Sequence, residues 1–223
     1  MQKILILFLV LICSCNRLPD SKGDFNEVII ISSIKDKKII FNRVDSLFSD
    51  YINTPNIENL YDTKWADIEN FNDYLDYRNI IFFSLSTPAD STIDLLLRKF
   101  NKTYNSNLYA LNDLYAKNQI LIFLSTKDSN SFIQDLEANN DWILNSLNEN
   151  IDKYLKSYIY INGVNDSINK IISTNFDIDF IAQKDYLVVK DNTDKESFLW
   201  IGRGYPYRWL TFKIINLSSD ILL

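Results

Sequence analysis

The first fifteen residues constrain the chain most, because they predict which part is removed before folding and where the folded part is held. Met1-Gln2-Lys3 gives a short positive start, and residues 4–12 form an unbroken apolar run. This run has the length of the apolar region of a secretory signal and is too short to span a bilayer as a finished helix. The sequence therefore predicts an export leader over residues 1–15.

The leader ends in Ile12-Cys13-Ser14-Cys15, which resembles a bacterial lipobox. Cys15 fits as the lipid acceptor because small Ser14 precedes it, whereas Cys13 would place bulky Ile12 where a small residue is needed. Lipobox cysteines carry a diacylglyceryl thioether and usually an N-acyl chain, and each buried methylene contributes about 0.8 kcal/mol to membrane binding. The partner implied is a lipid bilayer, held through acylated Cys15. The alternative is an ordinary cleaved signal or an uncleaved anchor with incidental cysteines.

Residues 16–24 are polar, include Pro19 and Gly23, and predict a tether. At about 3.3 Å per residue, such a tether keeps the folded part within roughly 30 Å of the membrane. Asn16 is not the aspartate that retains lipoproteins at the inner membrane in well-studied Gram-negative bacteria. The sequence therefore favours a cell-envelope protein on the outer membrane and leaves open whether it faces the periplasm or the cell surface.

Composition excludes several kinds of catalytic site. The chain has no histidine, and its two cysteines both lie in the leader. A Ser-His-Asp triad, a Cys-His pair, a histidine metal site and a thiolate zinc site therefore cannot be assembled. The four glycines do not form a phosphate-binding loop or a dinucleotide-binding turn. We expect no metal and no cofactor, and only carboxylate, hydroxyl, lysine or tyrosine chemistry remains.

The charge balance makes nucleic acid a poor partner. The net charge is −6, and the mature part contains no run of lysine or arginine that could follow a phosphate backbone. An apolar share of 47% predicts a buried core rather than disorder.

Apolar patterning predicts an α+β fold. Short β-branched and aromatic runs predict buried strands over 27–32, 79–85 and 120–124, and apolar residues three and four apart predict helices over 41–51 and 128–149. Residues 152–173 are amphipathic but interrupted at Asn162-Gly163, which indicates two helices or one broken helix.

The last third changes to alternating runs separated by polar turns, which predict a C-terminal antiparallel meander over 176–181, 186–190, 198–201 and 209–215. The expected fold is a mixed or antiparallel sheet packed with helices. We expect an α+β domain over 25–150, followed over 151–223 by a helix and antiparallel strands that could be an incomplete second domain.

Five short motifs resemble a family of uncharacterised bacterial envelope lipoproteins, classed as a domain of unknown function. The motifs are Asn16-Arg17-Leu18-Pro19, Asn26-Glu27-Val28-Ile29, Tyr77-Arg78-Asn79-Ile80-Ile81, Tyr115-Ala116-Lys117-Asn118-Gln119 and Phe198-Leu199-Trp200-Ile201-Gly202-Arg203. The resemblance implies no catalytic residues. Members of the family continue with further strands, so a chain stopping at Leu223 is either a shortened member or a truncated one.

Three segments are candidate sites. The acidic segment 191–196 could hold calcium but lacks the glycine and distal glutamate of an EF-hand loop, so a polar turn explains it better. Asp177 and Asp179 could form a catalytic carboxylate pair, although a solvated strand face is the simpler interpretation.

The third candidate is a loop rich in arginine and aromatic residues, the types favoured at binding hot spots. Its candidate partner-binding residues are Arg203, Tyr205, Tyr207, Arg208 and Trp209. The alternative interpretation is a hairpin turn whose aromatic side chains complete the core.

Two functions follow from these observations. The first is a non-catalytic envelope lipoprotein that binds or scaffolds an envelope protein partner near the membrane. The second is a hydrolase of envelope polymers, which requires two carboxylates facing each other across a cleft, roughly 5 to 9.5 Å apart. The missing catalytic residue types favour the first.

Overall fold

The computed structural model describes residues 18–53, 55–86, 93 and 107–215. The chain divides between Tyr154 and Leu155 into two compact units, here called unit 1 and unit 2. The predicted boundary lies between residues 150 and 151. Cys15 lies outside the described residues. Within the described ranges, no helix is both long and apolar enough to cross a membrane.

Unit 1 is built on a five-stranded sheet with the order β4-β1-β5-β7-β6. The first four strands in that order are parallel, and β6 pairs with β7 in the antiparallel direction. The predicted buried strands are confirmed, because nearly every side chain of the three central strands is shielded from solvent. The bounds are β1 (Glu27–Ser32), β4 (Asp62–Asp67), β5 (Asn79–Leu85), β6 (Leu108–Asn112) and β7 (Ile120–Thr126).

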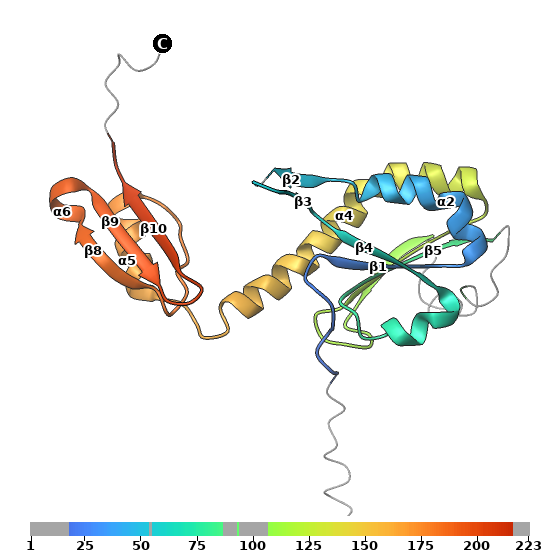
Figure 1. Cartoon of the computed structure of the whole chain (residues 1–223), viewed down its shortest axis with the longest axis horizontal. Coiled ribbons are helices and arrows are strands. Elements are labelled where there is room, and N and C mark those ends of the chain that lie inside the picture. Colours follow the sequence, from blue (N-terminus) through green and yellow to red (C-terminus); the bar gives the residue numbers. More distant parts are fainter. Residues whose placement is uncertain (1–17, 54, 87–92, 94–106, 216–223) are drawn as a thin grey trace, which may run out of the picture. The chain divides into compact units, whose positions relative to one another are not determined.

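Helices α2 (Ile34–Leu47) and α4 (Ser129–Ile159) lie over one face of this sheet, and the 3-10 helix η1 (Ile68–Tyr74) lies on the other (Figure 1). Phe132 of α4 packs edge-on against Phe83, with ring centres 5.4 Å apart. On the opposite face Phe71 packs against Phe82 at 5.0 Å. A short hairpin of β2 (Tyr51–Asn53) and β3 (Ile57–Asn59) precedes β4. Both faces of the sheet are therefore covered, as a mainly parallel sheet requires.

Unit 2 contains the predicted antiparallel meander, in the order β10-β9-β8. Ile168 and Ile172 of α5 pack against Leu199 and Ile201, so that α5 covers one face of the three strands (Figure 1). The bounds are α5 (Asp166–Phe176), β8 (Leu187–Asn192), α6 (Thr193–Glu196), β9 (Phe198–Arg203) and β10 (Arg208–Lys213). The α+β class is confirmed, and α4 and α5 are separate helices, as the Asn162-Gly163 interruption predicts.

The strand predicted over 176–181 is wrong. Helix α5 continues to Phe176 and ends at Asp177, whose φ of 55° is left-handed, and residues 178–181 form no strand. The alternation has another cause: Phe176 and Phe180 both contact the ring of Phe212, at 5.7 and 5.5 Å. The alternating pattern arises because the last residue of α5, Phe176, and Phe180 in the irregular segment after it both pack against the core.

Candidate functional site

The β9–β10 hairpin of unit 2 places the predicted loop residues at its tip. Arg203 ends β9, Arg208 and Trp209 begin β10, and the two tyrosines lie in the turn between the strands. Tyr205 is 90% exposed, Tyr207 77% and Trp209 66%. The interpretation as a hairpin whose aromatic side chains complete the core is therefore not supported for these three residues.

Trp209 lies across the backbone of Gly202, its partner in the strand register. A Cβ atom at position 202 would come within 2.7 Å of Trp209 Cδ1 and 3.3 Å of Val189 Cγ2. Trp200 contacts Trp209 edge-on, with ring centres 6.1 Å apart. The absence of a side chain at Gly202 thus lets two tryptophans and a valine gather on one face of the sheet.

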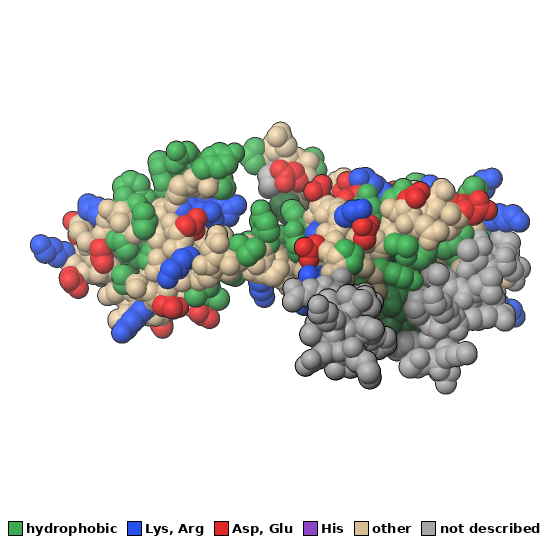
Figure 2. Space-filling model, turned by 90° about the horizontal axis from the view of Figure 1, so that it is seen from below, with side chains coloured by type: hydrophobic (Ala, Val, Ile, Leu, Met, Phe, Trp, Pro, Cys, Tyr) green, Lys and Arg blue, Asp and Glu red, His purple; other side chains and the backbone are tan. Residues whose placement is uncertain are grey.

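That face, opposite α5, is here called the outer face of unit 2, and it carries Leu187, Val189, Trp200 and Trp209. Leu187 and Val189 are themselves exposed. Hydrophobic side chains gather along one side of unit 2 in Figure 2, at the upper left of that view. Exposed apolar groups of this kind, concentrated on one face, mark interaction surfaces in soluble domains.

Arg203 differs from the other four predicted residues because its guanidinium makes contacts that stabilise the fold of unit 2. Its Nη2 lies 2.7 Å from the carboxylate of Asp185, its Nη1 donates to Gln183 Oε1, and its guanidinium lies over the ring of Tyr186 at 6.0 Å. These contacts tie the end of β9 to the segment before β8. Arg203 therefore holds the hairpin in place.

A cavity of about 310 Å³ lies beside the hairpin within unit 2. Its charged lining consists of Lys184, Arg203, Arg208 and a single carboxylate, Asp185. Among the described residues, neither Lys184 nor Arg208 makes an ion pair. A second cavity, in unit 1, is also lined by one carboxylate, Glu137. Neither cavity contains the two carboxylates that the hydrolase alternative requires.

The two other candidate segments have structural explanations. Asp177 ends α5, so it and Asp179 do not share a strand face. Asp191 accepts hydrogen bonds from the backbone N–H and hydroxyl of Thr193, at 3.0 and 2.8 Å, and these bonds lower the pKa of its carboxyl. The segment 191–196 contains the single turn α6, and the described part of the chain contains no cluster of three potential metal-binding side chains.

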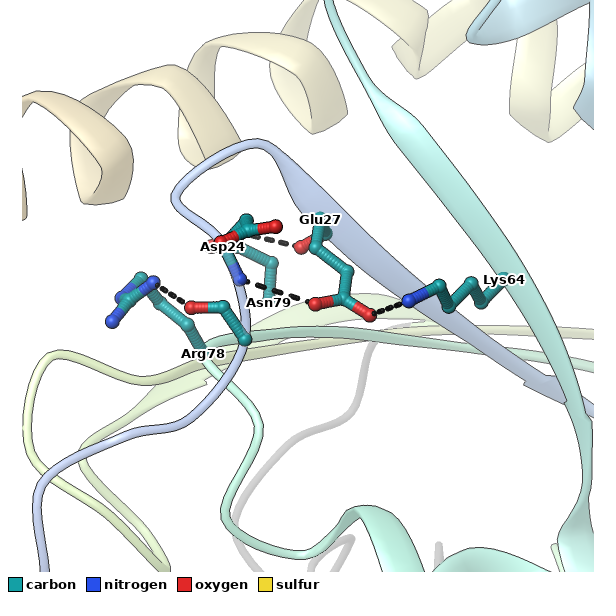
Figure 3. A network of polar contacts seen from close by, with 6 residues as sticks. Asp24, Glu27, Lys64, Arg78 and Asn79 are labelled. Carbon is teal, nitrogen blue, oxygen red and sulfur yellow. Dashed lines mark hydrogen bonds and ion pairs between the residues drawn. The ribbon is translucent and has the colours of Figure 1, made fainter.

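Unit 1 contains a set of buried polar residues that the sequence did not predict as a site. They lie where β1, β5 and β7 begin, at the N-terminal edge of the sheet, and are Glu27, Arg78, Asn79, Gln119 and Asn150. The carboxylate of Glu27 accepts from Lys64 Nζ at 2.6 Å and from the backbone N–H of Asp24 at 3.1 Å (Figure 3). The available signal was the polar residues directly before two apolar strands, Arg78-Asn79 and Asn118-Gln119.

Arg78 makes the main contacts at this edge. Its Nη1 donates to the carbonyl of Gly23 at 2.7 Å (Figure 3), and its Nη2 donates to the carbonyl of Ser21 at 3.4 Å. The guanidinium also lies over the ring of Tyr154, 3.6 Å from its centre. Burial lowers the pKa of Arg78, although arginine remains charged in proteins. A buried cation thus holds the chain that precedes β1.

Comparison with known proteins finds a family for the part of the chain that contains most of unit 1. A family model described as a domain of unknown function (DUF8532) matches residues 21–158. No curated protein and no solved structure matches the chain. The match covers the parallel sheet with its helices, while the hairpin of unit 2 lies beyond it.

Proposed function

The chain belongs to the DUF8532 family, whose function is unknown, and we propose that it is a lipid-anchored protein of the bacterial cell envelope that binds a protein partner through unit 2. The anchor is supported by the leader and by the lipobox at Cys15. Asn16 supports a place on the outer membrane. The binding role is carried by one observation, the exposure of Tyr205, Tyr207 and Trp209 on a single hairpin.

Covering these exposed side chains with a partner contributes favourably to the free energy of binding. Burying one large apolar side chain contributes about 1.5 to 3 kcal/mol, and tyrosine, tryptophan and arginine dominate binding hot spots. The β9–β10 pairing and Gly202 already fix the position of Trp209, so little side-chain entropy remains to be lost on binding. The hairpin is therefore suited to bind as a preformed surface.

The charges around the outer face indicate what kind of partner fits. Lys190 lies over the ring of Phe198 at 5.8 Å, and Lys213 is paired with Phe198 in the strand register. Arg208 lies next to the hairpin turn, directly before Trp209, and lines the cavity. Cations beside exposed aromatic side chains favour a partner that presents apolar groups surrounded by carboxylates, because opposite potentials guide the encounter and fix the register.

A photocrosslinking experiment tests the binding role. The photoreactive residue p-benzoylphenylalanine replaces Tyr207 in the full chain, expressed in a Gram-negative host and irradiated in intact membranes. The same replacement at Tyr51, which is exposed on the β2–β3 hairpin of unit 1, is the matched control. We expect a discrete adduct from position 207 that Trp209→Ala abolishes and that Lys213→Glu weakens, with none from position 51. Equal adducts from both positions, or adducts insensitive to Trp209→Ala, would refute the binding surface.

Intact-mass spectrometry tests the anchor independently. The membrane-extracted protein should show cleavage before Cys15 and a diacylglyceryl adduct, and a Cys15→Ser variant should lack the adduct. An unmodified mass would remove the anchor and leave the binding role of unit 2 to be judged by crosslinking alone.

A further inference from the structure

Residues 19–24, here called the docked segment, form part of the folded unit rather than a free tether. The backbone N–H of Lys117 donates to Pro19 O at 2.8 Å, that of Lys22 donates to Asp76 O at 2.7 Å, and that of Arg78 donates to Lys22 O at 3.0 Å. The predicted tether over 16–24 is therefore folded against unit 1 for most of its length. The docked segment crosses the N-terminal edge of the sheet, bridging the loops before β5 and β7.

Side chains reinforce these backbone bonds. Arg78 holds the carbonyls of Ser21 and Gly23, while Lys22 pairs with Asp76 at 2.8 Å. Gly23 has a φ of 85°, and a Cβ there would come within 2.8 Å of Glu27 Oε2. A segment fixed by a buried arginine and packed this closely is held rigidly against unit 1, because hydrogen bonds from charged donors are among the strongest in proteins.

The docked segment leaves three residue steps between Cys15 and Leu18, the first described residue. A fully extended chain covers at most about 3.6 Å per residue, so the lipid-bearing residue lies within roughly 11 Å of Leu18. The nine-residue tether predicted from the sequence would have allowed roughly 30 Å. Given the lipid anchor of the proposed function, we infer that the N-terminal edge of the unit 1 sheet rests on the headgroup surface of the membrane and fixes the orientation of this unit.

The chemistry of this edge fits zwitterionic lipid headgroups. Two ion pairs lie at its surface, Lys22 with Asp76 and Lys117 with Asp20, the latter at 3.4 Å, and the exposed carboxylate of Asp24 lies beside them. Phe25 is exposed close by, directly after the docked segment. The ammonium groups of Lys22 and Lys117 can face headgroup phosphates, and the neighbouring carboxylates can face the positive groups of zwitterionic headgroups.

The experiment uses the two ends of β7 as a matched pair. Lys117 precedes the strand at the docked edge and Lys127 follows it at the far edge, and both are exposed. The mature chain has no free thiol once Cys15 is acylated, so Lys117→Cys and Lys127→Cys each give one labelling site. The lipidated full chain, labelled with a fluorophore, is reconstituted in phosphatidylcholine vesicles that contain a lipid with a nitroxide on its headgroup.

We expect the label at 117 to be quenched at least about twofold more than the label at 127, because a seven-residue strand separates the two positions by roughly 23 Å. A twelve-residue Gly-Ser spacer between Leu18 and Pro19 keeps the anchor and the docked segment and should abolish the difference. Equal quenching in the chain without the spacer, or a difference that persists with it, overturns the inference.

A separate measurement distinguishes a chain whose residues 19–24 are not docked from a chain that carries no lipid on Cys15. In a Cys15→Ser chain that carries no lipid, hydrogen exchange should show protected amides at Lys22 and Asp24, and Arg78→Lys should reduce that protection. Unprotected amides would show that residues 19–24 are not docked, and would leave the lipid anchor on Cys15 unaffected. Protected amides together with an unmodified Cys15 in the mass measurement overturn the anchor and, with it, the membrane orientation.

Discussion

Replacing Gln119 with leucine should destabilise unit 1 by about 3 to 5 kcal/mol, because this buried amide uses all of its hydrogen-bonding groups. Its Nε2 donates to the carbonyls of Leu75 and Tyr77, both at 2.7 Å. Its Oε1 accepts from the backbone N–H groups of Tyr115 at 2.9 Å and Ala116 at 3.3 Å. Gln119 therefore joins the two loops that receive the docked segment.

The magnitude follows from the four backbone groups that leucine would leave without partners. Each buried donor or acceptor without a partner costs about 1 to 3 kcal/mol, and part of this cost is recovered where water reaches the half-buried groups of Tyr77 and Tyr115. Leucine also adds apolar surface to the core, which offsets a further share. The remaining loss is large beside the total stability of about 5 to 15 kcal/mol that is typical of a domain.

A second substitution at the same position tests the orientation of the amide. In Gln119→Glu one oxygen can still accept from Tyr115 and Ala116, but the other would face two carbonyls. The introduced carboxyl must therefore hold a proton in the folded state, which raises its folded pKa above the ordinary value of about 4.3. The stability of the Gln119→Glu variant relative to the wild type is then retained below about pH 4 and lost as pH rises through the folded pKa of this carboxyl.

Hydrogen exchange of the β5 amides reports the free energy of unfolding of unit 1 without a contribution from unit 2. Gln134→Leu, at an exposed glutamine of α4, is the matched control and should change stability by less than about 0.5 kcal/mol. A loss below about 1 kcal/mol for Gln119→Leu would refute the four-bond network. A Gln119→Glu variant whose stability gap to the wild type does not widen with pH would refute the orientation of the amide.

Three further predictions concern separate parts of the chain. Asp128 accepts hydrogen bonds from the N–H groups of Asn130 and Ser131, chiefly the latter, which lower its pKa, so the stabilisation it gives α4 is present above about pH 4 and is lost as pH falls through the folded pKa. The difference in melting temperature between wild type and Asp128→Ala should therefore shrink on acidification, and a constant difference would contradict this. Gly202→Ala should displace the Trp209 ring, which changes tryptophan fluorescence and weakens the crosslink from position 207 at a cost of less than about 1 kcal/mol, since Trp209 is largely exposed. Unchanged fluorescence would contradict the close approach. Phe132→Ala should cost about 3 to 5 kcal/mol in chemical denaturation, because the buried ring packs edge-on against Phe83, and a loss under about 2 kcal/mol would contradict that packing.

The sequence determined the elements whose signal is local. The apolar run 79–85 must be a buried strand because β-branched and aromatic side chains on both faces leave no solvated side. The absence of histidine, and the position of both cysteines among the first fifteen residues, restrict the chemistry of the chain whatever its fold. The hairpin residues Tyr205, Tyr207 and Trp209 were predicted as a binding loop from composition, although composition alone could not establish that they are exposed.

Only the tertiary structure decided which polar residues are buried and which part of the predicted tether is folded. Arg78 and Gln119 precede apolar strands in the sequence and could equally have been solvated. They are buried because the loops before β5 and β7 meet at one edge, where the carbonyls of Ser21, Gly23, Leu75 and Tyr77 need donors. Those contacts join residues more than forty positions apart, which no local periodicity can report. The sequence thus predicts a tether before unit 1, whereas long-range hydrogen bonding decides how much of that predicted segment is folded.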